Sequence, residues 1–300
     1  MSEWLLAGSW QTWALWLPGL PLLAAAWVAL GYTLGWNRGE SGERETARVV
    51  LGSGILVWLM LLGLGISSLL IQTPGTLSGF TWLHSASYQV RYSLLLDGLS
   101  LSTALVFSLS ILLAMRFSVN YLHREPGFQR FFLTLSLFHG GVLLVVLAGN
   151  ALLAFVGWEL VGVSSYLLIA YHQHRRTAAI HATRAFVTNR IGDAFFLLAL
   201  FTALNYLGTV EWPLIFQQSL HSHNLSLTVL AFSLLVPALI KSAQFPFSAW
   251  ITDALEGPTP SSAAFMAQCS ATSACFCCCA WRRCWNSCRC SAICCCSVAA

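Results

Sequence analysis

The chain has 300 residues, of which 57% are hydrophobic and only 9% are charged, with a formal net charge of +4. Soluble domains carry about 25% charged residues, so this composition excludes an ordinary soluble globular protein and indicates an integral membrane protein. The small positive charge does not indicate a nucleic-acid partner, because it records a bias of arginines toward the polar segments between apolar runs.

Apolar runs long enough to cross the ~30 Å hydrocarbon core recur along the chain. Because lipid cannot satisfy free backbone polar groups, each run is expected to be a helix. The first run is too long for a secretory signal, and it has no basic stretch before it and no cleavage site after it. The sequence predicts an all-α polytopic transmembrane bundle of about seven complete helices, with a truncated eighth from Ser261. The complete helices are expected at 13–36, 49–71, 99–117, 131–148, 150–171, 185–207 and 227–247.

Arginines are unevenly distributed over the polar segments between these helices. Three lie in each of the segments 37–48, 116–130 and 172–184, whereas the intervening segments hold Arg91 alone or none. Cytoplasmic loops carry an excess of Lys and Arg, and acidic residues do not cancel this rule. We therefore expect a multi-pass membrane protein with its N-terminus outside the cytoplasm, which for a bacterial inner membrane is the periplasm.

Four ionisable side chains lie inside the predicted helices: Glu159, Arg190, Asp193 and Lys241. Each costs about 2.5 to 3.5 kcal/mol at a helix centre on insertion scales, so each should face the bundle interior. Arg190 and Asp193 are three residues apart on one helical face and can pair with each other. The alternatives to a transport role are a protonated Glu159 that serves only helix packing and a purely structural Arg190–Asp193 ion pair.

Lys241 is the only lysine among the 15 basic residues. Arginine does not deprotonate in proteins, so a lysine indicates a desolvated base that has to lose its proton. It lies in "PALIKSAQFPF", between Pro237 and Pro246. Each proline removes a backbone donor and clashes one turn back, which predicts a kinked or broken helix of the kind that lines transport sites. A lysine that reaches from the helix end to the interface is the alternative.

These residues also carry a family resemblance. The stretches "LLLDGLSL", "GWELVGVSSYLLIAY", "AFVTNRIGD" and "KSAQFPFSAWITDALEGPTPSSA" resemble the antiporter-like membrane subunits of respiratory complex I. The likeness is greatest to the large L or fifth-subunit type that is shared with Mrp sodium/proton antiporters, and it covers residues 92–264. It implies the first half of an inverted-repeat antiporter-like fold.

The resemblance also implies roles for the buried charges. Glu159 matches the fifth-helix glutamate of a proton-translocating half-channel, and Lys241 matches the lysine of its broken seventh helix. Arg190 and Asp193 match the sixth-helix pair, whereas Ser248 stands where the family usually has a histidine and receives no role. In the expected mechanism a carboxylate stabilises the charged lysine, so the distance between Glu159 and Lys241 acts as the switch.

Partners and cofactors follow from the same resemblance. The implied partners are other membrane subunits of a multi-subunit complex and the lipid bilayer, with protons transported and with Na⁺- or bicarbonate-linked transport as alternatives. Quinone and electron transfer belong to other subunits of such complexes, so no cofactor and no redox chemistry are expected in this chain. In agreement, the first 268 residues hold neither a Gly-rich nucleotide loop nor a CxxC ligand set.

Two further functions stay open. The stretch "NYLHREPGFQRFF" at 120–132 resembles homologues encoded beside a DAB-type inorganic-carbon uptake system, in which the same scaffold would drive bicarbonate accumulation. A truncated, non-conducting membrane scaffold is the other possibility.

The end of the sequence differs in character from the rest. All 11 cysteines lie between Cys269 and Cys296, with spacings that fit neither a zinc site nor a secreted disulfide framework. The segment is typical of an altered reading frame, because a frame offset by one encodes ordinary membrane-helix residues; a metal-binding or lipid-modified tail is the alternative. We divide the chain into N-terminal helices and a connecting loop (1–98), an incomplete first antiporter-like repeat (99–264) and a Cys-rich tail (265–300).

Overall fold

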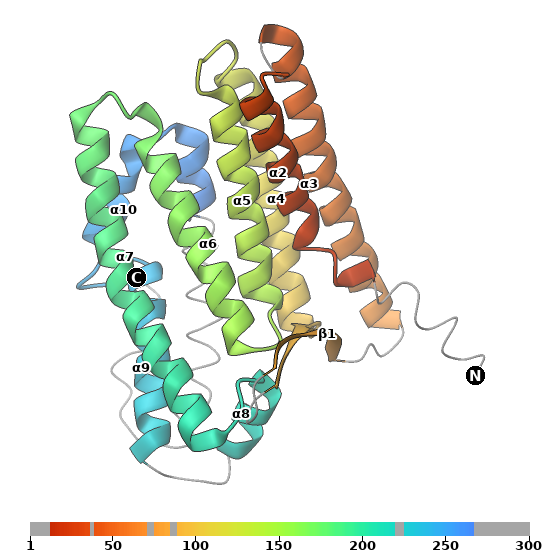
Figure 1. The fold of residues 1–300 in the computed structure, drawn as a ribbon, viewed down its shortest axis with the longest axis vertical. Helices are drawn as coiled ribbons and strands as arrows, with labels where there is room; N and C mark the ends of the chain where they lie inside the picture. The colour runs from red at the N-terminus through yellow and green to blue at the C-terminus, as the bar shows by residue number, and fades with distance from the viewer. Residues whose placement is uncertain (1–12, 37–38, 71–74, 85–88, 220–224, 267–300) are drawn as a thin grey trace.

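A computed structural model describes residues 13–36, 39–70, 75–84, 89–219 and 225–266. In this part of the chain, long helices stand side by side, with a small two-stranded sheet at one end of the bundle (Figure 1). By length and composition, 5 of the helices can cross a membrane, and two shorter apolar helices accompany them. The predicted fold class is therefore confirmed. Most of the predicted Cys-rich tail lies outside the described residues.

Seven helices correspond to the seven predicted runs. They are α2 (Gly19–Leu34), α3 (Gly39–Leu70), α4 (Gly98–Tyr121), α5 (Phe128–Leu147), α6 (Ala151–Ile169), α7 (Arg176–Thr202) and α9 (Leu225–Lys241). Residues 259–266 are again helical, where the eighth helix was predicted to begin. Short turns extend α6 and α7 at their C-terminal ends: the 3-10 helix η1 (Ala170–His172) and the π-helical η2 (Ala203–Leu207).

Two of the predicted boundaries are wrong in the same way. Helix α3 begins at Gly39 and α7 begins at Arg176, so the polar segments before residues 49 and 185 are helical rather than loops. Hydropathy marks only the part of a helix that lipid surrounds, whereas a helix can continue into water when polar side chains support it. In α3 such support comes from Glu45 and Arg48, one turn apart, whose side chains lie 2.7 Å from each other.

A β-hairpin and a short helix were not predicted. Strands β1 (Thr76–His84) and β2 (Gln89–Leu95) pair antiparallel, with Ser78 opposite Ser93. Helix α8 (Trp212–Ser219) lies at the same end of the bundle (Figure 1). The backbone of β2 also bonds to the segment before α6, since the amide of Gly149 donates to the carbonyl of Ser93 at 2.8 Å. The hairpin therefore fixes the start of α6.

Asn150 joins the hairpin to helix α6. This residue is fully buried, and its side-chain oxygen accepts a hydrogen bond from the amide of Leu153 at 2.7 Å, as an N-cap does. Its amide nitrogen donates to the Arg91 carbonyl at 2.7 Å. The Ser93 hydroxyl donates to the Glu211 carboxylate at 3.2 Å, and burial raises the pKa of Glu211. A polar network thus links β2, α6 and the segment before α8.

Helix α5 is the centre of the bundle, with contacts to α2, α3, α4 and α6. Its contact with α6 depends on glycines. A Cβ on Gly157 of α6 would lie 2.7 Å from the Leu144 Cβ, and a Cβ on Gly141 of α5 would lie 2.9 Å from the Val161 side chain. Small residues permit such close backbone approach between membrane helices. The close packing places α6 firmly against the core, with its other side toward α7.

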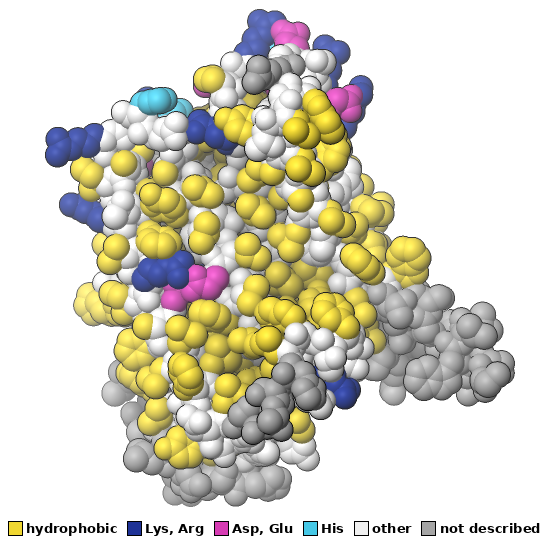
Figure 2. Space-filling model, in the orientation of Figure 1, with side chains coloured by type: hydrophobic (Ala, Val, Ile, Leu, Met, Phe, Trp, Pro, Cys, Tyr) yellow, Lys and Arg dark blue, Asp and Glu magenta, His cyan; other side chains and the backbone are white. Residues whose placement is uncertain are grey.

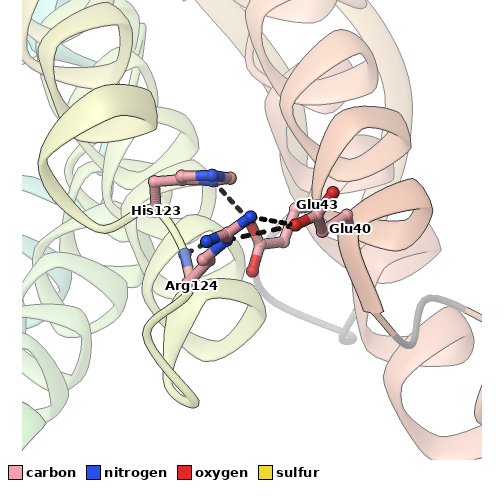
Figure 3. Close-up of polar contacts among 4 residues, drawn as sticks. All are labelled: Glu40, Glu43, His123 and Arg124. Carbon is pink, nitrogen blue, oxygen red and sulfur yellow. Dashed lines mark hydrogen bonds and ion pairs between the residues drawn. The ribbon is translucent and has the colours of Figure 1, made fainter.

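The three arginine-rich segments lie at one end of the bundle. Figure 2 shows that basic side chains gather there, away from the hairpin end. The start of α3 and the turn between α4 and α5 meet in one group of side chains, which we call the end cluster: Glu40, Glu43, His123 and Arg124 (Figure 3). The Arg124 guanidinium contacts Glu40 at 2.6 Å and the His123 ring contacts Glu43 at 3.0 Å. These contacts therefore link the start of α3 to the turn between α4 and α5.

Candidate functional site

Helix α9 ends at Lys241. Pro237 lies inside the helix, and beyond Lys241 the chain turns through Ala243, whose φ is 53°, and a cis Phe245–Pro246 peptide before α10 (Ala249–Asp253) and the 3-10 turn η3 (Ala254–Glu256). The predicted break is therefore present, directly after the lysine. The indole of Trp250 in α10 donates to the Ile240 carbonyl at 2.7 Å, which satisfies one of the carbonyls exposed by the break.

Close packing brings the end of α9 to α7. A Cβ on Gly192 would lie 3.3 Å from the Cα of Pro237, so the two helices approach backbone to backbone at this level. Asp193 follows Gly192 directly, and Arg190 lies almost one turn before it. The glycine therefore positions both charged side chains of α7 beside the last turn of α9.

The charged side chains of α6 and α7 form a continuous series of contacts. Arg190 Nη1 lies 2.5 Å from Glu159 Oε2 and 3.4 Å from Asp193 Oδ2, so one guanidinium serves two carboxylates. The other oxygen of Asp193 accepts a hydrogen bond from the indole N–H of Trp158 at 2.9 Å. Trp158 directly precedes Glu159 in α6. The contacts therefore run from Glu159 in α6 to Arg190 and Asp193 in α7, and from Asp193 back to Trp158 in α6.

Lys241 completes the series. Its Nζ lies 5.4 Å from the centre of the Trp158 ring, within the range of a cation–π contact, and it attracts the Asp193 carboxylate electrostatically. One turn along α6, a Cβ on Gly162 would lie 3.7 Å from this Nζ, so the missing side chain leaves room for the ammonium. We call Glu159, Arg190, Asp193, Trp158 and Lys241 the mid-span chain.

The mid-span chain runs from the outside of the described bundle to its interior. The side chains of Arg190 and Glu159 are 35% and 27% exposed, whereas Lys241 is only 3% exposed. Figure 2 shows acidic and basic side chains together at mid-height over α6 and α7, surrounded by hydrophobic ones. Ionisable groups in such a position are costly, so they indicate a pathway or a functional contact.

The structure brings all four predicted side chains together, with two differences in detail. Arg190 and Asp193 pair as their spacing predicted, but the hydrogen-bonding partner of Glu159 is Arg190, which the sequence analysis did not anticipate. Trp158 was also missed. A signal for it existed, because a tryptophan buried in an apolar helix needs an acceptor for its N–H, and a carboxylate on the next helix can supply one.

Glu159, Asp193 and Lys241 can hold, pass on and release protons, whereas Arg190 stays charged. A change of charge on one of these groups alters the stability of the others. The arrangement offers little to a metal ion. Within the described ranges, no three His, Cys, Asp or Glu side chains are grouped closely enough to hold one. The fold and the site thus define a polytopic helical membrane protein with a charged series of side chains beside a broken helix.

Comparisons with known proteins agree with this class. Residues 148–285 match the family model described as "NADH:quinone oxidoreductase/Mrp antiporter, TM", and residues 82–132 match "NADH-Ubiquinone oxidoreductase (complex I), chain 5 N-terminus". The chain belongs to this family of antiporter-like membrane subunits, as its motifs predicted.

Individual relatives support the assignment. NADH-quinone oxidoreductase subunit L of Mycobacterium tuberculosis is 37% identical over 259 residues, which are 85% of this chain and 40% of that protein. NADH-ubiquinone oxidoreductase chain 5 of Neurospora crassa is 33% identical over 81% of this chain and 33% of its own length. In fold, the chain resembles the Mrp complex from Dietzia sp. DQ12-45-1b with a TM-score of 0.68 and 22% identity, over 85% of this chain and 27% of that one. The chain therefore spans less than half the length of these relatives.

Proposed function

We propose that this chain forms a proton-translocating half-channel within a membrane subunit of a complex I-like assembly. The mid-span chain is the observation that carries the proposal. Helix packing alone does not require four ionisable side chains at this depth, where each of them is costly. The redox chemistry of such an assembly would belong to other subunits, which are the proposed partners together with the lipid bilayer.

The contacts suggest how protonation at one end acts on the other. Arg190 is shared between Glu159 and Asp193, so a proton that neutralises Glu159 releases the guanidinium toward Asp193. Asp193 then attracts the Lys241 ammonium less, and the lysine gives up its proton more easily. Protonation of Glu159 therefore acts on Lys241 through Arg190 and Asp193. The distance between Glu159 and Lys241 does not itself have to change.

A proton suits this site better than a sodium ion. Arg190 and Lys241 repel an incoming cation, and the carboxylates of Glu159 and Asp193 are both engaged by the guanidinium. A proton needs no coordination shell, because it adds directly to one of the side chains. Coupling of proton translocation to the transport of Na⁺ or bicarbonate is a separate prediction.

Substitution of Lys241 tests the proposal in sealed membrane vesicles that carry the chain in its native assembly. Lys241→Arg keeps a positive charge but cannot release its proton, and Lys241→Met removes the charge while it keeps most of the apolar stem. We expect both variants to assemble in normal amounts and both to lose proton translocation. A structural role would instead tolerate arginine, so near-normal proton uptake by Lys241→Arg contradicts the proposal.

We also propose that the arginine-rich end of the bundle faces the cytoplasm of a bacterial cell, with the N-terminus in the periplasm. The gathering of basic side chains at one end supports this orientation (Figure 2). In a chain whose native cysteines are replaced by serine, Arg44→Cys and Arg124→Cys should react only with reagents that enter the cytoplasm. Reaction with an impermeant thiol reagent added to intact cells would reverse the orientation.

A further inference from the structure

Trp158 occupies the one position in the mid-span chain where an aromatic ring separates an acid from a base. Its N–H donates to Asp193, and the ammonium of Lys241 lies near its ring. Its side chain is almost fully buried, and its ring stacks on Phe196 of α7 with centroids 5.5 Å apart. Three contacts, two with α7 and one with α9, therefore fix the orientation of this one side chain.

Each contact of Trp158 favours a charged form of its neighbour. A hydrogen bond from a donor stabilises the carboxylate of Asp193 relative to its neutral form. The negative face of the indole ring stabilises an ammonium, and more strongly where water is absent. The carboxylate form of Asp193 in turn attracts Lys241. Both effects therefore act in the same direction on the lysine.

We propose that Trp158 is a positioning residue that holds Asp193 and the ring face toward Lys241, and thereby sets how firmly the lysine keeps its proton. This inference rests on the proposed function, in which Lys241 gains and loses a proton. The other titratable groups around it are Glu159 from α6 and Arg190 from α7, which pair with each other. Trp158 is thus an uncharged member of the mid-span chain that adjusts the lysine.

The single lysine makes a direct test possible. When the full chain is produced with ¹³C-labelled lysine and placed in lipid nanodiscs, every lysine signal in the NMR spectrum comes from Lys241. The chemical shift of its Cε changes as the amine loses its proton, so a pH titration gives the midpoint for this one group. The reading requires no transport activity.

We expect Trp158→Leu to lower the titration midpoint of Lys241 by about one pH unit, because about 0.5 to 2 kcal/mol of ring–cation attraction is lost and one unit equals 1.36 kcal/mol. Trp158→Phe keeps a ring but loses the N–H, so its shift should be smaller. Phe155→Leu is the matched control, because Phe155 stacks on the same Phe196 ring at 5.5 Å. Its midpoint should equal that of the unchanged chain.

An unchanged Lys241 midpoint in Trp158→Leu would overturn the proposed role of Trp158. An equal shift in Phe155→Leu would also overturn it, because general loosening of the aromatic packing would then explain the effect. Trp158→Phe provides a folded variant if the leucine variant fails to assemble, and a midpoint identical to that of the unchanged chain would again refute the inference. The Lys241→Arg transport assay judges the proposed function separately.

Discussion

The end cluster and the mid-span chain use the same chemistry in opposite surroundings. At the end of the bundle, Arg124 and Glu40 lie 2.6 Å apart with side chains 72% and 55% exposed. At mid-height, Arg190 and Glu159 lie 2.5 Å apart with exposures of 35% and 27%, and a second carboxylate and a lysine lie beside them. The two arginine–glutamate distances are almost equal, so distance alone does not distinguish the pairs.

The difference lies in what replaces each pair when it is broken. Water solvates the exposed side chains of Arg124 and Glu40, so their ion pair contributes little to stability. At mid-height, apolar side chains surround the charged groups, so water solvates a group poorly when it loses its partner. The comparison teaches that a short ion-pair distance marks an important site only when the surroundings are apolar.

The largest effect is expected from Arg190→Leu. This change leaves two carboxylates, Glu159 and Asp193, without their shared counter-charge. Removal of one partner from a fully buried pair costs about 3 to 5 kcal/mol, and we expect a smaller loss here because the Arg190 and Glu159 side chains are 35% and 27% exposed. The free energy of unfolding in mixed detergent micelles measures the loss. A cost below about 1 kcal/mol, as for an exposed pair, would show that the two regions do not differ in the way we describe.

A smaller effect is expected at Glu211, whose carboxylate accepts a hydrogen bond from Ser93 in the polar network at the hairpin end. Burial raises the folded-state pKa of Glu211 above the ordinary value of 4.5. The stability that comes from its protonated form is therefore fully present below pH 4.5 and is lost as the pH rises through the raised pKa. Glu211→Gln should remove this decline while it preserves an acceptor for the Ser93 hydroxyl.

Unfolding free energies measured at a series of pH values compare Glu211→Gln with the unchanged chain. Their difference should grow in favour of the glutamine variant as the pH rises toward neutrality. Parallel curves for the two proteins would mean that Glu211 is as well solvated as the carboxylates of the end cluster.

The smallest effect is expected from Arg124→Leu, the counterpart of Arg190→Leu at the end of the bundle. We expect a much smaller loss than for Arg190→Leu, and one that shrinks further in high salt, because salt screens exposed charges. The free energy of unfolding of Arg124→Leu in mixed detergent micelles, measured at low and high salt, gives the size of the loss and its dependence on salt. A salt-independent loss as large as that of Arg190→Leu would remove the contrast between the regions.

The sequence alone predicted the helices and the identity of the ionisable residues, because both depend on local composition. Continuous apolar runs can satisfy their backbone only as helices, so α4, α5 and α6 were found close to their actual bounds. Charges stand out against such runs, which is how Glu159 and Lys241 were recognised. The spacing of Arg190 and Asp193 correctly predicted that these two would pair.

The contacts between helices could not be predicted in the same way. The pairing of Glu159 with Arg190 depends on how α6 rotates against α7, and the approach of Lys241 to Trp158 depends on the close contact of Gly192 with Pro237. The hairpin was missed for a different reason. Its strands lie in the polar end region, where alternation of side chains rather than a long apolar run is the signal.

The end of α9 at Lys241 has an electrical consequence. Peptide dipoles in a helix add up to a partial negative charge of about one half at the C-terminal end, and cations in the last turn gain about 0.3 to 1 kcal/mol, or up to about 2 kcal/mol where they are partly buried. Because the helix ends at Lys241 and the chain turns away directly after it, this pole lies at the lysine. The backbone itself thus acts as a permanent counter-ion, which stays in place whatever the protonation of the surrounding side chains.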